Sequence, residues 1–236
     1  MTNRLRLGLL ATTGAIALAA APSVTAQNAI AEVAATDAGH QVGAADAPVS
    51  LIEFFSYTCP HCGTFAREGD GPLQIAYIMP RKVRVEYRPM IHDPVDLTLT
   101  MMVDCAGPDN FTHYHSAVMA RQDRWLARAR QASQGERQLW SQAGTEASAR
   151  RTIASSLDLY DIFEGRGLRQ TTLDQCLSDQ AKANALMMAA NENRATFGRI
   201  GTPSFAIDGV LVENVHSWNA LQPVLDESVA RAAPAQ

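Results

Sequence analysis

The sequence of 236 residues has few lysines, few aromatic residues and few cysteines. Its two lysines, Lys82 and Lys182, and its formal net charge of −4 at pH 7 leave no basic stripe for a nucleic acid and no polybasic segment for a membrane surface. Charged residues make up 19% of the chain and hydrophobic residues 47%. This balance argues against disorder and predicts one domain with a proper core, with room for an insertion.

Long hydrophobic runs are also missing, except at the N-terminus. Arg4 and Arg6 form a short positive region, residues 7–21 are almost wholly apolar or small, and residues 24–26 (Val-Thr-Ala) resemble a small-x-Ala cleavage site. The run is too short and too rich in alanine for a comfortable membrane span. We predict a cleaved secretory signal over residues 1–26, with an uncleaved N-terminal anchor as the alternative. The mature chain should then be located in an oxidising compartment, where disulfide bonds persist.

Two of the four cysteines stand in the motif Cys59-Pro60-His61-Cys62, directly after an apolar run at 49–57. A Cys-x-x-Cys pair that leaves a buried strand and opens a helix suits thiol-disulfide exchange, because helix N–H groups and the helix dipole stabilise the first sulfur as a thiolate. Pro60 fits the first helical position, where no N–H donor is needed. Cys59 should be exposed and Cys62 turned toward the core. The alternatives are a structural disulfide or half of a metal site, although a structural zinc would want a second paired cluster.

Two ionisable residues are candidates for tuning this motif. His61 can lend a positive charge or an N–H to the Cys59 thiolate, and each unit by which the pKa of Cys59 falls is worth about 1.4 kcal/mol, or roughly 30 mV in favour of an oxidising disulfide. The alternative is a solvent-exposed histidine with no electrostatic part. Glu53 lies within the strand that we expect to be buried, where a carboxylate needs a partner or a function. A salt bridge at a sheet edge is the alternative for Glu53.

Patterns along the chain predict a strand, a helix, a strand, a block of helices, a hairpin and a last helix. Strands are expected at 49–57, 82–89, 204–207 and 210–213, with a short edge strand at 40–43 and a hairpin turn at 208–209. The helix after the motif should kink or split at 69–72 and resume at 73–79. Further helices are expected at 94–105, 110–120, 134–142, 146–157, 172–177, 181–197 and 217–229.

The predicted fold class is therefore α/β, a split β-sheet domain with a helical insertion. We predict a linker and lead-in over 27–47, a sheet domain made of 48–92 and 199–232, and a helical insertion over 93–198.

The two remaining cysteines, Cys105 and Cys176, lie in the predicted helical block. Leftover cysteines in an oxidising compartment usually pair, and closing so long a loop could stabilise the domain by up to about 4 kcal/mol. Two separate buried thiols are the alternative, because a sequence gives no distance. His113 and His115 are two residues apart and fall on different helix faces, so we predict no metal site, and no cofactor is called for.

The chain resembles the DsbA-like periplasmic thiol-disulfide oxidoreductases, which have a thioredoxin-like fold with an inserted all-helical domain. The resemblance covers essentially the whole mature chain. It rests on the order of elements, on the motif at 59–62 after the strand, and on Gly201-Thr202-Pro203 before the late hairpin. It implies that Cys59 is the exposed nucleophile and Cys62 its buried partner. Some relatives also carry a second disulfide in the helical domain.

The resemblance assigns roles to three further residues. The family carries an acid at the position of Glu53, where it eases proton movement at the buried thiol. Thr202-Pro203 matches the family's cis-proline loop, which lies against the dithiol and presents main-chain groups to an extended peptide. Here Thr202 stands where the best-known oxidases with this motif have valine and related isomerases have threonine.

The residues and the resemblance together predict a protein that donates disulfides to reduced exported proteins. We expect a periplasmic monomer that a quinone-linked membrane partner reoxidises and that binds no nucleic acid. An isomerase or reductase of the same fold is one alternative, although residues 27–47 are too few for an N-terminal dimerisation domain. A non-catalytic binding or chaperone module with a structural disulfide is the other.

Overall fold

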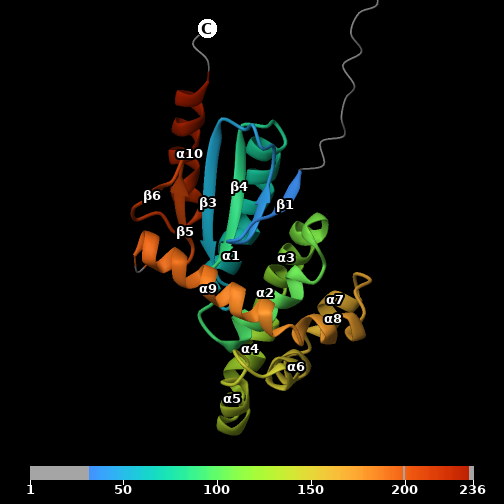
Figure 1. Ribbon diagram of the computed structural model, residues 1–236. Helices are drawn as coiled ribbons and strands as arrows, with labels where there is room; N and C mark the ends of the chain where they lie inside the picture. Colours follow the sequence, from blue (N-terminus) through green and yellow to red (C-terminus); the bar gives the residue numbers. More distant parts are fainter. Residues whose placement is uncertain (1–31, 199, 234–236) are drawn as a thin grey trace, which may run out of the picture.

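The computed structural model describes residues 32–198 and 200–233, which form a sheet with flanking helices and a block of helices at one end of it (Figure 1). The predicted signal, residues 1–26, and the first residues of the predicted lead-in lie outside the described residues. Within the described ranges, no helix is long and apolar enough to cross a membrane.

The sheet has six strands in the order β1-β2-β4-β3-β5-β6. The strands are β1 Val33–Ala35, β2 His40–Val42, β3 Val49–Phe55, β4 Val83–Pro89, β5 Ser204–Ile207 and β6 Val210–Val212. Only β3 and β4 pair in parallel, and every other neighbouring pair is antiparallel. All residues of β3 except Ser50 are buried, as its nearly continuous apolar run predicts, whereas β4 alternates between buried and half-buried residues. The strands predicted at 49–57, 82–89, 204–207 and 210–213 are thus confirmed.

The predicted lead-in, 27–47, contains two strands of the sheet. β2, which we expected to be an edge strand, lies between β1 and β4, so β1 is the edge. Gly39 makes this hairpin possible, because a Cβ at Gly39 would lie 2.0 Å from the carbonyl oxygen of Tyr87 on β4. The three residues of β1 are Val-Ala-Ala, too short and too weakly patterned to be read as a strand from the sequence.

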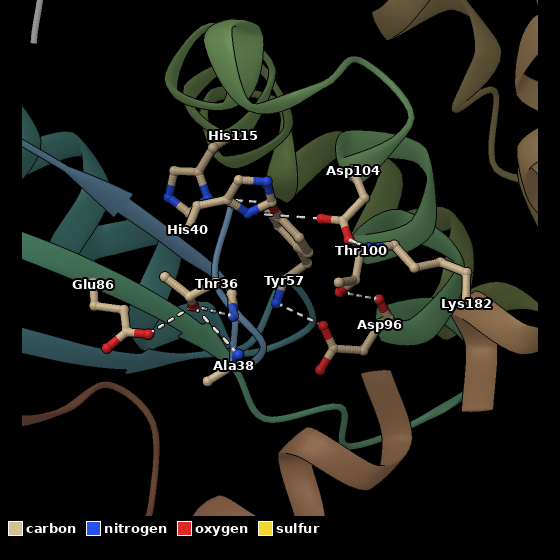
Figure 2. Close-up of polar contacts among 11 residues, drawn as sticks. Thr36, Ala38, His40, Tyr57, Glu86, Asp96, Thr100, Asp104, His115 and Lys182 are labelled. Atoms are coloured by element: carbon tan, nitrogen blue, oxygen red, sulfur yellow. Dashed lines mark hydrogen bonds and ion pairs between the residues drawn. The ribbon is translucent and has the colours of Figure 1, made fainter. Parts of the chain in front are cut away.

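A charge cluster ties this N-terminal hairpin to the helical block. The carboxylate of Asp104 forms an ion pair with Lys182 Nζ at 2.7 Å and lies 3.7 Å from His40 Nδ1 (Figure 2). The His40 ring also stacks on Phe111, with ring centroids 4.1 Å apart. Burial lowers the pKa of His40, so it contacts Asp104 mainly as a neutral ring.

Helix α1, Pro60–Leu73, follows β3 and runs on into a π-helical turn, η1, Gln74–Ile78. We expected residues 69–72 to kink or split this helix, but α1 continues through Pro72 and the irregularity is the π turn that follows. Gly69 is needed for packing, because a Cβ there would come within 3.1 Å of the Trp218 ring on α10. The last helix, α10, spans Trp218–Ala232.

Eight α-helices lie between β4 and β5 in the described chain, at the end of the sheet toward which β3 points (Figure 1). They are α2 Pro94–Asp104, α3 Phe111–Ala120, α4 Gln122–Gln131, α5 Gln134–Trp140, α6 Ala147–Ser156, α7 Tyr160–Glu164, α8 Gln170–Leu177 and α9 Gln180–Phe197, with a 3-10 turn, η2, at Pro108–Asn110. The predictions missed α4 and α7. α4 buries only Gln122, Trp125 and Leu126, and α7 is five residues long, so neither has a sustained apolar period.

Cys105 and Cys176 form a disulfide that joins the C-terminal end of α2 to α8, across a sequence separation of 71 residues. His113 and His115 lie on different faces of α3, His113 exposed and His115 buried. No cluster of side chains suited to a metal ion occurs among the described residues.

We predict that the Cys105–Cys176 disulfide stabilises the protein by up to about 4 kcal/mol, the chain-entropy value for a loop of this length. In a Cys59→Ser, Cys62→Ser background, a reductant should lower the free energy of unfolding by that order, as measured by denaturant titration. The same background with Cys105→Ala and Cys176→Ala should unfold like the reduced protein, and its free energy of unfolding should not change with reductant. An unfolding curve of the background variant that does not respond to reductant would contradict this role.

Candidate active site

The Cys59-Pro60-His61-Cys62 motif opens α1 immediately beyond the carboxyl end of β3. Cys59 is the N-cap residue with extended backbone angles, and Pro60 takes the first helical position. The Cys59 side chain is partly buried, Cys62 is fully buried, and both are free thiols in this structure. The buried position predicted for Cys62 is confirmed, whereas Cys59, which we expected to be exposed, is half-buried and is the more accessible of the two.

The Cys59 sulfur is stabilised as a thiolate. A hydrogen bond from the Cys62 side chain lowers the pKa of Cys59 to about 5, against the opposing effect of burial. The Thr202 side chain and the backbone N–H groups of Cys62 and His61 lower it further. The Thr202 carbonyl oxygen lies 3.0 Å from Cys59 Sγ and acts in the other direction, because it can accept a hydrogen bond only from the protonated thiol.

The Cys62 sulfur has the opposite character. Burial raises the pKa of Cys62 well above its ordinary value, and the nearby Cys59 thiolate and the Glu53 carboxylate raise it further. The two thiols therefore share one proton very unequally. Cys59 is a nucleophile at neutral pH, whereas Cys62 is a neutral thiol that must lose its proton before it can attack.

His61 contributes its backbone rather than its ring to the thiolate. Its side chain is exposed on the first turn of α1, and its ring makes no hydrogen bond within the described part of the chain. Its backbone N–H is one of the groups that lower the pKa of Cys59. The predicted tuning by the imidazole charge stays a prediction.

Glu53 lies in the middle of the sheet, on β3 between Tyr87 of β4 and Phe205 of β5. The side chain is 2% exposed, and Glu53 forms no ion pair with any described residue, so a salt bridge at a sheet edge is excluded as its role. Burial raises the pKa of Glu53 well above its ordinary value, and Asp70 raises it further. A carboxyl in this state can hold and release a proton near Cys62.

Thr202 and Pro203 lie beside the dithiol, joined by a cis peptide bond at the start of β5. The structure thus brings this loop, 143 residues away in sequence, into contact with Cys59. The Pro203 carbonyl oxygen lies 2.7 Å from His216 Nδ1, just before α10. His216 was not predicted, because nothing in its local sequence indicates this contact.

The loop that leads into the motif is held by the first turn of α2. Asp96, fully buried, accepts a hydrogen bond from the Tyr57 backbone N–H at 2.9 Å (Figure 2). It also accepts hydrogen bonds from the Ser56 hydroxyl at 2.6 Å and the His92 N–H at 3.0 Å. Burial raises the pKa of Asp96 to about 6 in spite of these donors. Asp93, the N-cap of α2, accepts a hydrogen bond from the Thr58 hydroxyl at 2.6 Å.

Gln122, at the start of α4, holds the same loop from another side. Its fully buried side chain donates from Nε2 to the carbonyl oxygens of Tyr57 and Cys59, each at 2.7 Å. Its amide lies against Gly63, where a Cβ would come within 2.1 Å of Gln122 Oε1. The sequence carries no signal for this contact, because the partners are more than 60 residues apart and meet only in the folded chain.

Comparisons with known proteins agree with this site and fold. The chain matches the family model described as thioredoxin over residues 35–227. It is 37% identical to the crystal structure of a protein-disulfide isomerase from Novosphingobium aromaticivorans, with a TM-score of 0.76, covering 82% of this chain and 97% of that one. The fold is also that of alpha-DsbA1 from Wolbachia pipientis, at 20% identity and a TM-score of 0.62, covering 81% and 91% of the two chains.

Curated relatives include putative protein-disulfide oxidoreductases of Rickettsia bellii and Rickettsia typhi, each 28% identical. The matches cover 80% and 70% of this chain but only 63% and 53% of the relatives' own length. The fold and the dithiol site place the chain among the thioredoxin-fold thiol-disulfide oxidoreductases. It belongs to the thioredoxin family, and the predicted resemblance to DsbA-like proteins with a helical insertion is confirmed.

We predict that the thiolate absorbance of Cys59 in the reduced protein titrates with a midpoint near pH 5. Because this folded pKa lies below the unfolded value of about 8.5, the stabilisation is fully present above about pH 8.5 and is lost as the pH falls through about 5. The free energy of unfolding of the reduced protein should therefore fall over that window, and Cys59→Ser should lack this component. Brief alkylation at mildly acid pH should label Cys59 first, and labelling of Cys62 first would reverse the two roles.

We also predict that Gln122→Leu lowers the free energy of unfolding by about 1–3 kcal/mol, because it removes the donor to two buried carbonyl oxygens at similar volume. Denaturant titration measures the change. Gln131→Leu, at the exposed end of the same helix, is the matched control and should be nearly neutral. Equal stability of the two variants would show that Gln122 does not anchor the loop.

Proposed function

We propose that this protein donates disulfides to reduced proteins through the Cys59-Cys62 couple. The observation that carries the proposal is the divergence of the two thiol pKa values, Cys59 lowered to about 5 and Cys62 raised. Stabilising the Cys59 thiolate stabilises the reduced form, and each pKa unit corresponds to roughly 30 mV toward a more oxidising couple.

The proposed reaction has two exchange steps. A substrate thiolate attacks Cys59 Sγ, the Cys59–Cys62 bond breaks, and Cys62 leaves as a thiolate that takes up a proton. A second substrate thiolate then attacks the substrate sulfur of the mixed disulfide, and Cys59 leaves as a stable thiolate. The substrate loses two electrons and the protein gains them. Glu53 is the proposed proton donor to Cys62. Because the His61 side chain is exposed, its ring can contact the incoming substrate.

The loop at Thr202-Pro203 is the proposed docking site for the substrate backbone. It precedes β5 and lies within hydrogen-bond distance of Cys59 Sγ, so an extended peptide that pairs with it would bring its cysteine to the reactive sulfur. The hydrogen bond between the Pro203 carbonyl oxygen and the His216 ring helps to fix the position of the loop.

We further propose that the protein acts as a monomer in an oxidising compartment outside the cytoplasm, on reduced exported proteins, and that a quinone-linked membrane partner reoxidises it. The predicted signal at 1–26 and the Cys105–Cys176 disulfide support this location, because structural disulfides persist in oxidising compartments.

Disulfide isomerisation is the second candidate function. Two observations favour it, namely the 37% identity to a solved protein-disulfide isomerase and the threonine at position 202. An isomerase needs the same nucleophile at Cys59 but must begin its cycle reduced.

We predict a reduction potential for the Cys59-Cys62 couple in the range of about −120 to −180 mV, measured by equilibration with glutathione. The oxidised protein should convert a reduced two-cysteine peptide to its disulfide in stoichiometric amounts. When reduced Cys62→Ser is given the disulfide form of the peptide, its Cys59 thiolate should attack that disulfide, expel the second peptide thiolate and accumulate the mixed disulfide. The Cys105→Ala, Cys176→Ala variant should keep the activity. A potential near −270 mV would show a reductase instead. If the protein rearranges scrambled disulfides faster than it oxidises reduced cysteines, it is an isomerase. If Cys59→Ser acts on the peptide as the wild type does, the protein is a binding module.

A further inference from the structure

We propose that Asp70 is the outer carboxyl of a proton path that connects the buried Cys62 to solvent by way of Glu53. This inference deepens the proposed exchange reaction and rests on it. Asp70 lies on α1, about two helical turns beyond Cys62, and was not among the residues that the sequence pointed to.

Glu53 by itself cannot deliver a proton to Cys62 repeatedly. Its side chain is 2% exposed and lies on the central strand β3, so any proton it gives up must be replaced through another group. Asp70 is close enough to Glu53 for its charge to raise the pKa of Glu53. Asp70 is partly exposed as a residue, although its Oδ1 atom is shielded from water. It is thus the carboxyl of this pair with contact to solvent.

Both carboxyls carry an oxygen without a partner. Glu53 Oε2 and Asp70 Oδ1 are buried and accept no hydrogen bond from any described residue, and no ion pair within the described ranges reaches either side chain. Two interacting carboxylates whose shielded oxygens lack partners are unfavourable without a cation unless a proton neutralises one of them. Burial accordingly raises the pKa of Asp70 to about 7. A proton held here near neutral pH is available for transfer.

An open cavity of about 710 Å³ supplies the water side of the path. Asp70 lines this cavity together with Gln74 from η1, Tyr87 from β4 and His115 from α3. The cavity has room for water beside Asp70, whereas Glu53 is not among its lining residues. Of the two interacting carboxyls, Asp70 is therefore the one that borders the cavity.

The groups that face the two carboxyls do not replace this proton. Tyr57 and Tyr87 stay protonated, because burial raises the pKa of each well above its ordinary value. His115 is neutral, because burial lowers its pKa to about 3, and its Nδ1 atom lies 3.1 Å from the Tyr57 hydroxyl (Figure 2). The other titratable residues of the cavity wall are Asp109, His113 and Arg166.

The proton steps balance in both directions. When substrate attack expels Cys62, the Cys62 thiolate takes the proton of Glu53, Glu53 takes the proton of Asp70, and Asp70 takes one from water in the cavity. When Cys62 attacks a mixed disulfide instead, its proton leaves by the same groups in reverse order. The electrons move only between sulfur atoms.

The test measures how fast Cys62 resolves a preformed mixed disulfide between Cys59 and glutathione, in the full chain, from pH 5 to pH 9. Glu53→Gln should slow this step about 10-fold or more near pH 7, and Asp70→Asn should slow it several-fold and alter its pH profile. Because the two groups act in series, the double variant should be no slower than Glu53→Gln alone. Glu68→Gln, exposed on the same helix, is the matched control and should match the wild type.

Infrared spectroscopy of the wild-type protein reports the protonation state of the carboxyls directly, and the variants assign the bands. Besides the carboxyl band of Asp96, a protonated carboxyl band should be present at pH 6, should titrate around neutral pH, and should be lost or shifted in Asp70→Asn and Glu53→Gln. A carboxyl band at pH 6 that is unchanged in both Asp70→Asn and Glu53→Gln would overturn the proton path, as would an Asp70→Asn pH profile equal to that of the wild type or additive effects of the two replacements.

The outcomes separate this inference from the proposed function. A wild-type protein that oxidises the peptide, with Asp70→Asn indistinguishable from it, would contradict the proton path alone. A wild-type protein that fails to oxidise the peptide, with resolution by Cys62 still slowed in Asp70→Asn, would contradict the donor function and support the path.

Discussion

The unequal sharing of one proton between two neighbouring sulfur atoms is the interaction on which the chemistry of this protein depends. Cys59 lies where the first N–H groups of α1 point outward, and Cys62 lies one turn deeper against the core. The same helix start therefore stabilises the charge on one sulfur and denies it to the other. The buried carboxyls, the proline loop and the sheet all act by maintaining or relieving this asymmetry.

The helical insertion takes part in the site through hydrogen bonds rather than through catalytic side chains. Asp93 and Asp96 from α2 and Gln122 from α4 hold the four residues from Ser56 to Cys59. Without these partners the loop would leave backbone groups unpaired at the point where β3 ends. The insertion thus fixes the position of Cys59, and the thioredoxin-like part supplies the chemistry.

Much of the fold could be predicted from the sequence where a pattern is local and strong. The strand before the motif, the hairpin at 204–213 and the order of elements follow from apolar runs and turn residues. Features that depend on distant contacts could not be predicted. β1 is a strand because β2 pairs with it, and Gln122 is an anchor because α4 folds back onto the loop. Asp70 on α1 acts on Glu53 of β3, 17 residues away in sequence, only through the folded arrangement of these two elements.

Gly63 and Gln122 have a consequence for how this sequence can change over time. The Gln122 amide occupies the space that a side chain at position 63 would need, and it is also the donor to two carbonyl oxygens of the loop. A larger residue at 63 alone forces the amide away, and a smaller one at 122 alone leaves a void and unpaired carbonyl groups. The two positions should therefore covary in related sequences, with a side chain gained at one accompanied by a shorter one at the other.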